Sequence, residues 1–197
     1  MARIRFAIAQ DAGALIEIMK QYIETPITLE YEVPSIAEME VQILAVSHAY
    51  PFLVIENDDE VIGFAFAHRD LDQPALSWNA ELRAYINLNQ RGHGYGFKAM
   101  EVLIDILRLQ NVQNVYSNVT EGNPRSESLH RKLGFVCCGT MHKTGFKNGR
   151  WLDVNLLERR ISDEKFETEP LPFIPVKKVD KKKLQEIFDK VNASIKD

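Results

Sequence analysis

The most constraining feature of this sequence is a glycine-rich turn that runs directly into an apolar segment with helical periodicity. Residues 89–107 read NQRGHGYGFKAMEVLIDIL and place Gly92, Gly94 and Gly96 within five positions. The first N–H groups of a helix have no partner inside the helix and lie at the positive end of its dipole. Because glycines leave the main chain accessible there, we expect residues 91–96 to bind a phosphate group.

Two common phosphate-binding loops do not match this turn. A dinucleotide fingerprint that starts at Gly92 needs a third glycine at position 97, which is Phe97. A P-loop needs glycine, lysine and then a hydroxyl residue, whereas the chain has Phe97, Lys98 and Ala99. The pattern that remains is Arg91-x-x-Gly94-x-Gly96.

This pattern resembles the acetyl-CoA pyrophosphate loop of the GNAT superfamily of N-acetyltransferases. One strand further on, NPRSESLHRKLGF at residues 123–135 resembles the second CoA-facing helix of that family and the strand after it. The segments IETPITLEYE, WNAE and TGFKNGRWLDV resemble the phosphinothricin N-acetyltransferase branch. The resemblance covers roughly residues 3–160.

The fold that the resemblance implies is α/β (α+β), with a mixed central sheet whose two parallel strands splay apart between flanking helices. The residue pattern agrees, because predicted strands and helices alternate without a strict βαβ repeat. Ser35 and Glu38 have the spacing of a capping box, and Asp11 stands where an N-cap belongs. Asn148 and Gly149 predict a hairpin turn.

The C-terminal region differs in composition from the rest. We assign residues 1–161 to the acetyltransferase domain and residues 162–197 to a linker and an amphipathic C-terminal helix, because 162–175 is acidic and rich in proline. Asp180 can cap this helix, whose apolar stripe is expected to pack on its own domain or on a second copy. The stripe consists of Leu184, Ile187, Phe188, Val191 and Ile195.

Composition excludes several classes of function. The 197 residues carry a net charge of −4, which argues against a nucleic-acid partner. Neither a secretory signal nor a membrane-spanning stretch is recognisable, so a cytoplasmic protein is expected. Cys137 and Cys138 are adjacent and cannot form an ordinary bridge with each other, so they are expected to be free and buried. No cysteine or histidine spacing indicates a metal site.

Acetylation of an amine needs a base. A primary alkylammonium group has a pKa of about 10, so supplying the neutral amine at pH 7 costs about 4 kcal/mol. Glu81 ends the WNAE segment before an apolar strand, where partial burial would make its carboxylate a better proton acceptor. The resemblance places the family's general base at Glu81 and a residue able to protonate the leaving thiolate at His130, although a histidine bonded to neighbouring backbone is a comparable alternative.

The resemblance also implies the remaining site residues and a homodimer. Acetyl-CoA, as cosubstrate, is expected to contact Leu82, Arg83, Ala84, Tyr85, Ile86, Arg91, Gly92, His93, Gly94, Tyr95, Gly96, Asn123, Ser126 and His130. The acceptor, a small-molecule primary amine that is an amino acid or analogue, is expected near Tyr22, Thr28, Trp78, Glu81, Lys147 and Arg150.

One departure from the branch concerns acceptor binding. The arginine and tyrosine that hold the acceptor's acidic group there correspond here to Gln73 and Leu76. Lys147, Arg150 or Arg69 could replace them; otherwise a less acidic amine is expected. Two alternative functions stay open, a noncatalytic acyl-CoA-binding module and a protein-lysine acetyltransferase.

Overall fold

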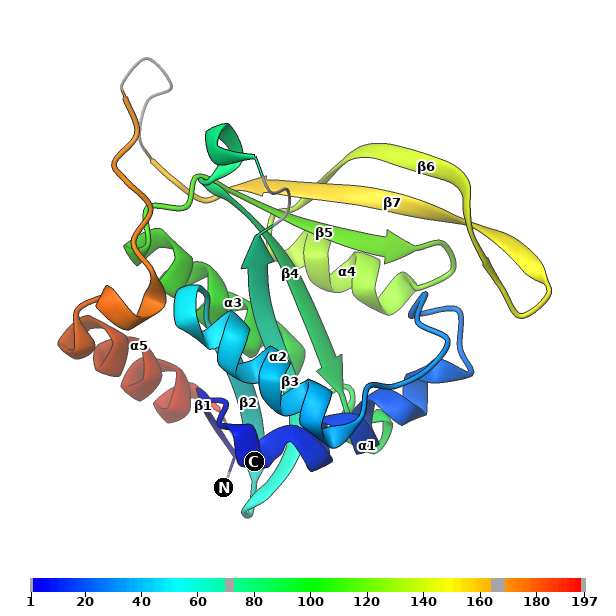
Figure 1. Ribbon diagram of the computed structural model, residues 1–197, viewed down its shortest axis with the longest axis horizontal. Helices are drawn as coiled ribbons and strands as arrows, with labels where there is room; N and C mark the ends of the chain where they lie inside the picture. The colour runs from blue at the N-terminus through cyan, green and yellow to red at the C-terminus, as the bar shows by residue number, and fades with distance from the viewer. Residues whose placement is uncertain (1, 70–72, 164–168, 196–197) are drawn as a thin grey trace.

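A mixed β-sheet forms the centre of the molecule (Figure 1). The computed structural model describes residues 2–69, 73–163 and 169–195. Within them, seven strands lie in the order β1-β2-β3-β4-β5-β7-β6, and all neighbours are antiparallel except the parallel pair β4 and β5. The strands are β1 (Arg3–Phe6), β2 (Phe52–Asn57), β3 (Glu60–Arg69), β4 (Asn79–Ile86), β5 (Asn114–Thr120), β6 (Val136–Lys147) and β7 (Arg150–Arg160). The predicted mixed sheet is therefore confirmed.

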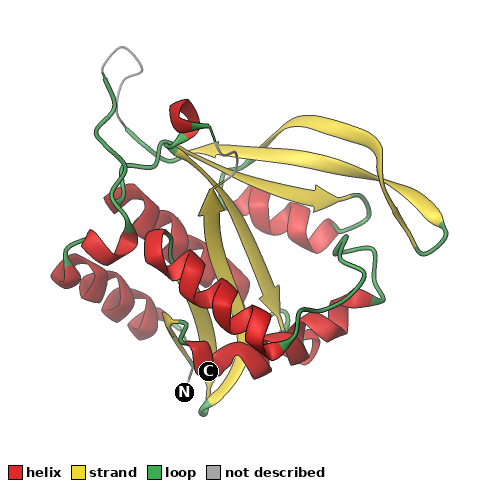
Figure 2. Cartoon of the chain, in the orientation of Figure 1, coloured by secondary structure: helices red, strands yellow, loops and turns green. Residues whose placement is uncertain are grey.

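Helices cover both faces of this sheet (Figure 2). They are α1 (Ala12–Ile23), α2 (Ile36–Ala49), α3 (Tyr95–Leu109), α4 (Pro124–Lys132) and α5 (Lys181–Ser194), with short 3-10 turns at Ala9–Asp11, Pro74–Leu76, Leu88–Gln90 and Val176–Lys178. The capping box at the start of α2 is confirmed, because Ser35 Oγ accepts from the Glu38 N–H and the Glu38 carboxylate accepts from the Ser35 N–H.

Asp11 precedes α1 as predicted, but its carboxylate does not cap that helix. Instead Asp11 accepts hydrogen bonds from the Arg5 guanidinium and from the Ile8 N–H. The pKa of Asp11 is lowered, because these hydrogen bonds outweigh the opposing effect of burial. The residue thus fixes the turn between β1 and α1 by an ion pair, which the sequence spacing did not indicate.

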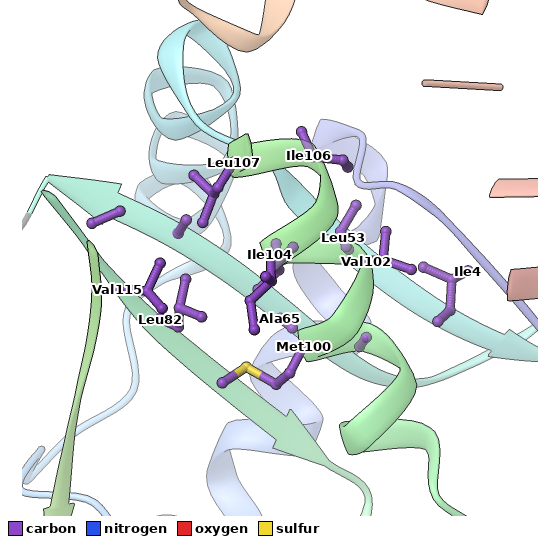
Figure 3. Packing of buried hydrophobic residues seen from close by; sticks show 14 of the residues in the cluster. Ile4, Leu53, Ala65, Leu82, Met100, Val102, Ile104, Ile106, Leu107 and Val115 are labelled. Carbon is purple, nitrogen blue, oxygen red and sulfur yellow. The ribbon is translucent and has the colours of Figure 1, made fainter. Parts of the chain in front are cut away.

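The hydrophobic core has two parts, one on each face of the sheet. On one face, α1 and α2 pack over alternate residues of β2 and β3, including Phe52, Phe64 and Phe66. On the other face, α3 packs over the intervening residues. Figure 3 shows Leu53 and Ala65 of these strands among side chains of α3. Because successive strand residues point to opposite faces and both faces are covered, residues 52–55 of β2 and 62–67 of β3 are apolar and buried on both sides.

The two parallel strands separate soon after they begin. The pairing of β4 with β5 covers only Asn79–Ala80–Glu81 against Asn114–Val115–Tyr116, and Figure 1 shows the two strands diverging beyond it. Past that point β4 stays paired with β3, and β5 stays paired with β7. The splay expected from the family resemblance is therefore present, and it opens the centre of the sheet.

The β6–β7 hairpin extends away from the body of the sheet and turns at Asn148-Gly149, both with positive φ, as predicted (Figure 1). Cys137 and Cys138 lie on β6 and are exposed. The prediction of buried thiols was wrong, because β6 is the outer strand of the sheet and most of its residues face solvent.

The C-terminal helix α5 packs on its own chain. Leu184, Phe188 and Val191 join the core against α3 and β1, as the apolar stripe predicted, and Asp180 caps the helix through the Lys182 and Lys183 N–H groups. The linker also contacts the domain: the side chain of Gln110 donates hydrogen bonds to the carbonyls of Ala49 and Ile174. The predicted linker includes residues 164–168, which lie outside the described residues.

Asn192 of α5 pairs with the edge strand β1. Its Oδ1 accepts from the Ile4 N–H at 2.7 Å, and its Nδ2 donates to the Ile4 carbonyl at 3.1 Å. We expect Asn192→Ala to lower the free energy of unfolding by about 1–3 kcal/mol, because two partly buried backbone groups lose their partners. Urea denaturation measures this effect. The matched control is Gln185→Ala on the exposed side of the same helix, and an equal effect of both variants would contradict the assignment.

Candidate active site

A cavity of about 1080 Å³ lies where β4 and β5 diverge. Its walls come from the glycine turn and the start of α3, from the second half of β4, from β5, and from α4. The loop after α1 forms one edge, and Ser194 and Ile195 at the end of α5 form another. Its size suits an elongated ligand, and its lining combines apolar side chains with many polar and charged ones.

The glycine turn has the geometry that the sequence predicted. Gly92 and Gly94 have φ values of +94° and +82°, which side chains rarely allow, and Gly94 is the N-cap of α3. The Arg91 guanidinium lies over the ring of Tyr22, 5.0 Å from its centroid. The turn therefore presents the helix N-terminus, free of side chains at two positions, together with a cation to the cavity.

The segment of β4 that borders the cavity has main-chain groups available on one edge. Leu82 to Ile86 pair with β3 but no longer with β5. The hydroxyl of Ser117 donates to the Leu82 carbonyl at 3.1 Å, and Tyr22 OH donates to the Ile86 carbonyl. The Ile86 N–H also donates to Tyr22 OH, so groups at both ends of this segment are used. The main-chain groups between Leu82 and Ile86 that face the splay can form strand-like hydrogen bonds with an extended ligand.

Glu81 lies at the last paired position of β4, where the strands begin to diverge. Its side chain is 8% exposed and lines the cavity. Oε1 accepts from Arg83 Nε at 3.0 Å, and Oε2 lies 3.8 Å from Nε2 of His68 on the neighbouring strand. A carboxylate has about four acceptor positions, so these contacts leave room for a further hydrogen bond from an amine or a water.

His130 of α4 also lines the cavity and is buried. Its Nδ1–H donates to the Ser126 carbonyl at 2.8 Å, so Nε2 is the acceptor nitrogen of the neutral ring. Nε2 is buried without a hydrogen-bond partner among the described residues. Burial lowers the pKa of His130, and the hydrogen bond to Ser126 only partly opposes this effect.

This lowered pKa makes stability depend on pH. Between the unfolded pKa of about 6.5 and the lower folded pKa, the unfolded chain binds more protons, so stability is lost as pH falls through this window. Urea denaturation at pH 7.5 and pH 5.5 should show a smaller loss for His130→Gln than for the wild type. By pH 5.5 this contribution to the loss is at most about 1.4 kcal/mol, because pH 5.5 lies one unit below the unfolded pKa. Equal losses in both proteins would contradict the burial argument.

The acceptor side of the cavity is formed by the loop after α1. Thr28 and Glu30 line it, as does Tyr85 of β4. Burial raises the pKa of Tyr85 and keeps it a neutral donor. Lys147 holds this loop in place: its buried Nζ donates to the Thr28 carbonyl at 2.7 Å and to the Glu30 carbonyl at 2.6 Å.

The other site residues proposed from the sequence fall into two groups. The predicted cofactor contacts all line the cavity, as do Tyr22, Thr28 and Glu81. Asn123 does so while capping α4, since its Oδ1 accepts from the Ser126 N–H.

Three predicted acceptor contacts lie elsewhere. Trp78 donates from Nε1 to the Leu171 carbonyl of the C-terminal linker. Lys147 donates to backbone carbonyls of the loop after α1, and Arg150 is exposed on the hairpin. The structure therefore does not bring these three side chains to the cavity.

Sequence reasoning missed several cavity residues. Glu30 and Ser117 line the cavity, and His68 faces Glu81 across the β3–β4 pair. Glu30 belongs to the IETPITLEYE segment, but nothing in that segment singles it out, and the fold of the loop brings it to the cavity. Strand pairing places Ser117 and His68. Within residues 2–69, 73–163 and 169–195, no group of acidic, histidine or cysteine side chains could hold a metal ion. None of the described helices has the length and apolar character to cross a membrane.

The fold and the cavity together define a class of acyltransferase, and comparison with known proteins identifies the family. Residues 4–156 match the family model for the acetyltransferase (GNAT) domain, so the chain belongs to the GNAT acetyltransferases. It is 29% identical over 177 residues to a phosphinothricin N-acetyltransferase of Streptomyces viridochromogenes, covering 89% of this chain and 95% of that protein. It is 30% identical over 172 residues to an L-amino acid N-acyltransferase of Escherichia coli, covering 85% of this chain and 96% of that protein.

A crystal structure has the same architecture. The phosphinothricin acetyltransferase of Sinorhizobium meliloti in complex with AcCoA superposes with a TM-score of 0.81 at 30% identity, covering 86% of this chain and 93% of that one. The chain is therefore an acetyl-CoA-dependent N-acetyltransferase similar to the phosphinothricin N-acetyltransferase branch.

Proposed function

We propose that this enzyme moves an acetyl group from acetyl-CoA to the primary amine of a small molecule, an amino acid or an analogue of one, with Glu81 as general base. The observation that carries the proposal is the position of Glu81. A buried carboxylate lies at the point where β4 leaves β5, in the same cavity as the glycine turn. An amine bound beside Glu81 is therefore near any thioester that enters through the splay.

Acetyl-CoA supplies the activated acyl group. The chain's own residues fit it, because the turn at 91–96 presents a helix N-terminus and the cation of Arg91 for the pyrophosphate, and the free edge of β4 suits the extended arm. Main-chain N–H groups near residues 83–85 are proposed to donate to the thioester oxygen as negative charge develops there.

The proposed reaction moves one proton from the acceptor amine and another to the leaving thiolate. The acceptor nitrogen gives a proton to the Glu81 carboxylate, directly or through a water, and forms the bond to the acyl carbon. The carbon–sulfur bond breaks and the thiolate leaves. The thiolate takes up a proton from solvent, or from Nε2 of His130 when that nitrogen is protonated, and Glu81 returns its proton to solvent. His130 is proposed in the supporting role near this end of the cavity. Its Nε2 must first be protonated to act as an acid, and the lowered pKa makes this harder above pH 6.5.

The finer assignments belong to the same proposal. Residues 1–161 form the catalytic domain, and residues 162–197 a linker and a supporting helix. A homodimer is supported by exposed apolar side chains on the β6–β7 hairpin, namely Val136, Met141, Phe146 and Trp151. Light scattering of the purified protein tests it, and a monomeric mass would count against it. A cytoplasmic location agrees with the use of acetyl-CoA and with two exposed free thiols.

The test is release of CoA from acetyl-CoA in the presence of a panel of amines. We expect turnover with free amino acids or their analogues and none with lysine-containing peptides. Tight acetyl-CoA binding without turnover of any amine would favour a noncatalytic acyl-CoA-binding module. Turnover of lysine peptides alone would favour a protein-lysine acetyltransferase.

A further inference from the structure

Arg83 stands beside the proposed base on the acceptor side of the cavity. Glu81, Arg83 and Tyr85 alternate along β4 and share the face that looks toward α1 and α2. Arg83 lines the cavity, and its side chain is 41% exposed, so a ligand can reach it. Glu30 lies opposite, with Oε1 3.9 Å from Arg83 Nη1.

The guanidinium of Arg83 has donors to spare. Its Nε–H is used by Glu81 at 3.0 Å, while the 3.9 Å separation from Glu30 is too long for a hydrogen bond. A guanidinium carries five N–H donors, and its terminal amino groups suit two-point binding of a carboxylate. The Glu81–Arg83 pair therefore offers an acceptor for an ammonium group and donors for an anion, next to each other.

The other cations that the sequence suggested for anion binding do not reach the cavity. Lys147 donates to two backbone carbonyls, and neither Arg150 on the exposed hairpin nor Arg69 at the end of β3 lines the cavity. The remaining cations that line the cavity belong to the glycine turn, α3 and α4, namely Arg91, Lys98, Arg125 and Lys132. Among the described cavity residues, Arg83 is the cation that contacts Glu81.

We infer that Arg83 binds a carboxylate carried on the carbon next to the acceptor's amine, so that the enzyme selects α-amino acids over simple amines. The inference rests on the proposed function and names its substrate class. In the bound acceptor, the amine faces Glu81 and the carboxylate faces the terminal amino groups of Arg83. This zwitterion matches the ion pair charge for charge, so neither residue is left without a partner.

The experiment compares acids with their amides in wild type and Arg83→Gln. L-methionine, L-phenylalanine and L-tryptophan are each paired with the corresponding α-carboxamide, and kcat/KM is measured from CoA release. We expect the wild type to prefer the acids. Arg83→Gln should lower kcat/KM for the acids roughly 10- to 100-fold, the value of a lost charge-assisted hydrogen bond, and for the amides less than about 3-fold. Arg83→Lys should retain part of the preference.

A control variant at a second arginine shows whether the effect is specific to Arg83. Arg150→Gln removes a cation from the exposed hairpin and should leave the ratio of acid to amide turnover unchanged. Equal losses for acids and amides in Arg83→Gln would show that Arg83 only supports Glu81, and would overturn the inference. A wild type that does not distinguish acids from amides would overturn it as well. If no acid or amide releases CoA, the proposed function fails, and the inference fails with it.

Discussion

Replacing Glu81 with glutamine should lower kcat by about 10²- to 10⁴-fold, the usual contribution of a positioned general base. Glutamine preserves the size of the side chain and its capacity to accept from Arg83 Nε, but it cannot take a proton from the acceptor amine. Because this substitution does not alter the glycine turn, acetyl-CoA binding should stay within a few-fold. Steady-state kinetics together with calorimetric titration of acetyl-CoA would separate the two quantities.

A control variant and the pH dependence of the rate test this prediction further. Glu17→Gln changes a glutamate on the exposed face of α1, paired with Lys20 outside the cavity, and should leave kcat unchanged. Rate should also recover partly at high pH in Glu81→Gln, since solvent then supplies more of the neutral amine. Unchanged turnover in Glu81→Gln would remove Glu81 from its proposed role, even if the protein remains an acetyltransferase.

Replacing Leu103 with alanine should cause the largest loss of stability among the changes considered, about 2–5 kcal/mol. Leu103 lies in the middle of α3 with no exposed surface, in the core between this helix and the sheet. Truncation removes buried apolar area and leaves a cavity that the surrounding strands cannot close, because they are held by hydrogen bonds on both sides. Urea denaturation followed by circular dichroism measures the change.

Leu44→Ala is the matched control, because Leu44 is a helical leucine on α2 that is 60% exposed. Its substitution should change the free energy of unfolding by less than about 1 kcal/mol. Acetyl-CoA should recover part of the stability lost in Leu103→Ala, since a ligand of the folded state stabilises it according to its concentration. Similar losses in the two leucine variants would contradict the core described for α3.

Local sequence signals predicted much of the fold correctly. The capping box at Ser35, the glycine turn at the start of α3, and the Asn148-Gly149 turn depend on interactions within a few residues, and all are present. The family resemblance added the mixed sheet and the splay of its two parallel strands. The prediction that Asp11 caps α1 was wrong, because its carboxylate binds the guanidinium of Arg5 on β1 instead.

The candidate site also has one side that local sequence predicts and one side that it does not. Its cofactor side could be predicted, because the glycine turn and the start of α4 are continuous segments that carry their own geometry. Its acceptor side could not, because contacts between distant segments decide it. Lys147 is buried beneath a loop more than a hundred residues away, and Glu30 reaches the cavity only because that loop is held there.

By itself, the sequence predicted most of the elements and the glycine turn that is proposed to bind phosphate, since both depend on short-range backbone geometry. The family resemblance supplied the residue that is proposed as the base. The tertiary structure alone decided which charged side chains meet. Strand pairing sets which residues share the face of Glu81, and packing of the hairpin on the loop decides which cations stay available. Arg83 gains its proposed role from that arrangement, because an ion pair depends on distance in space.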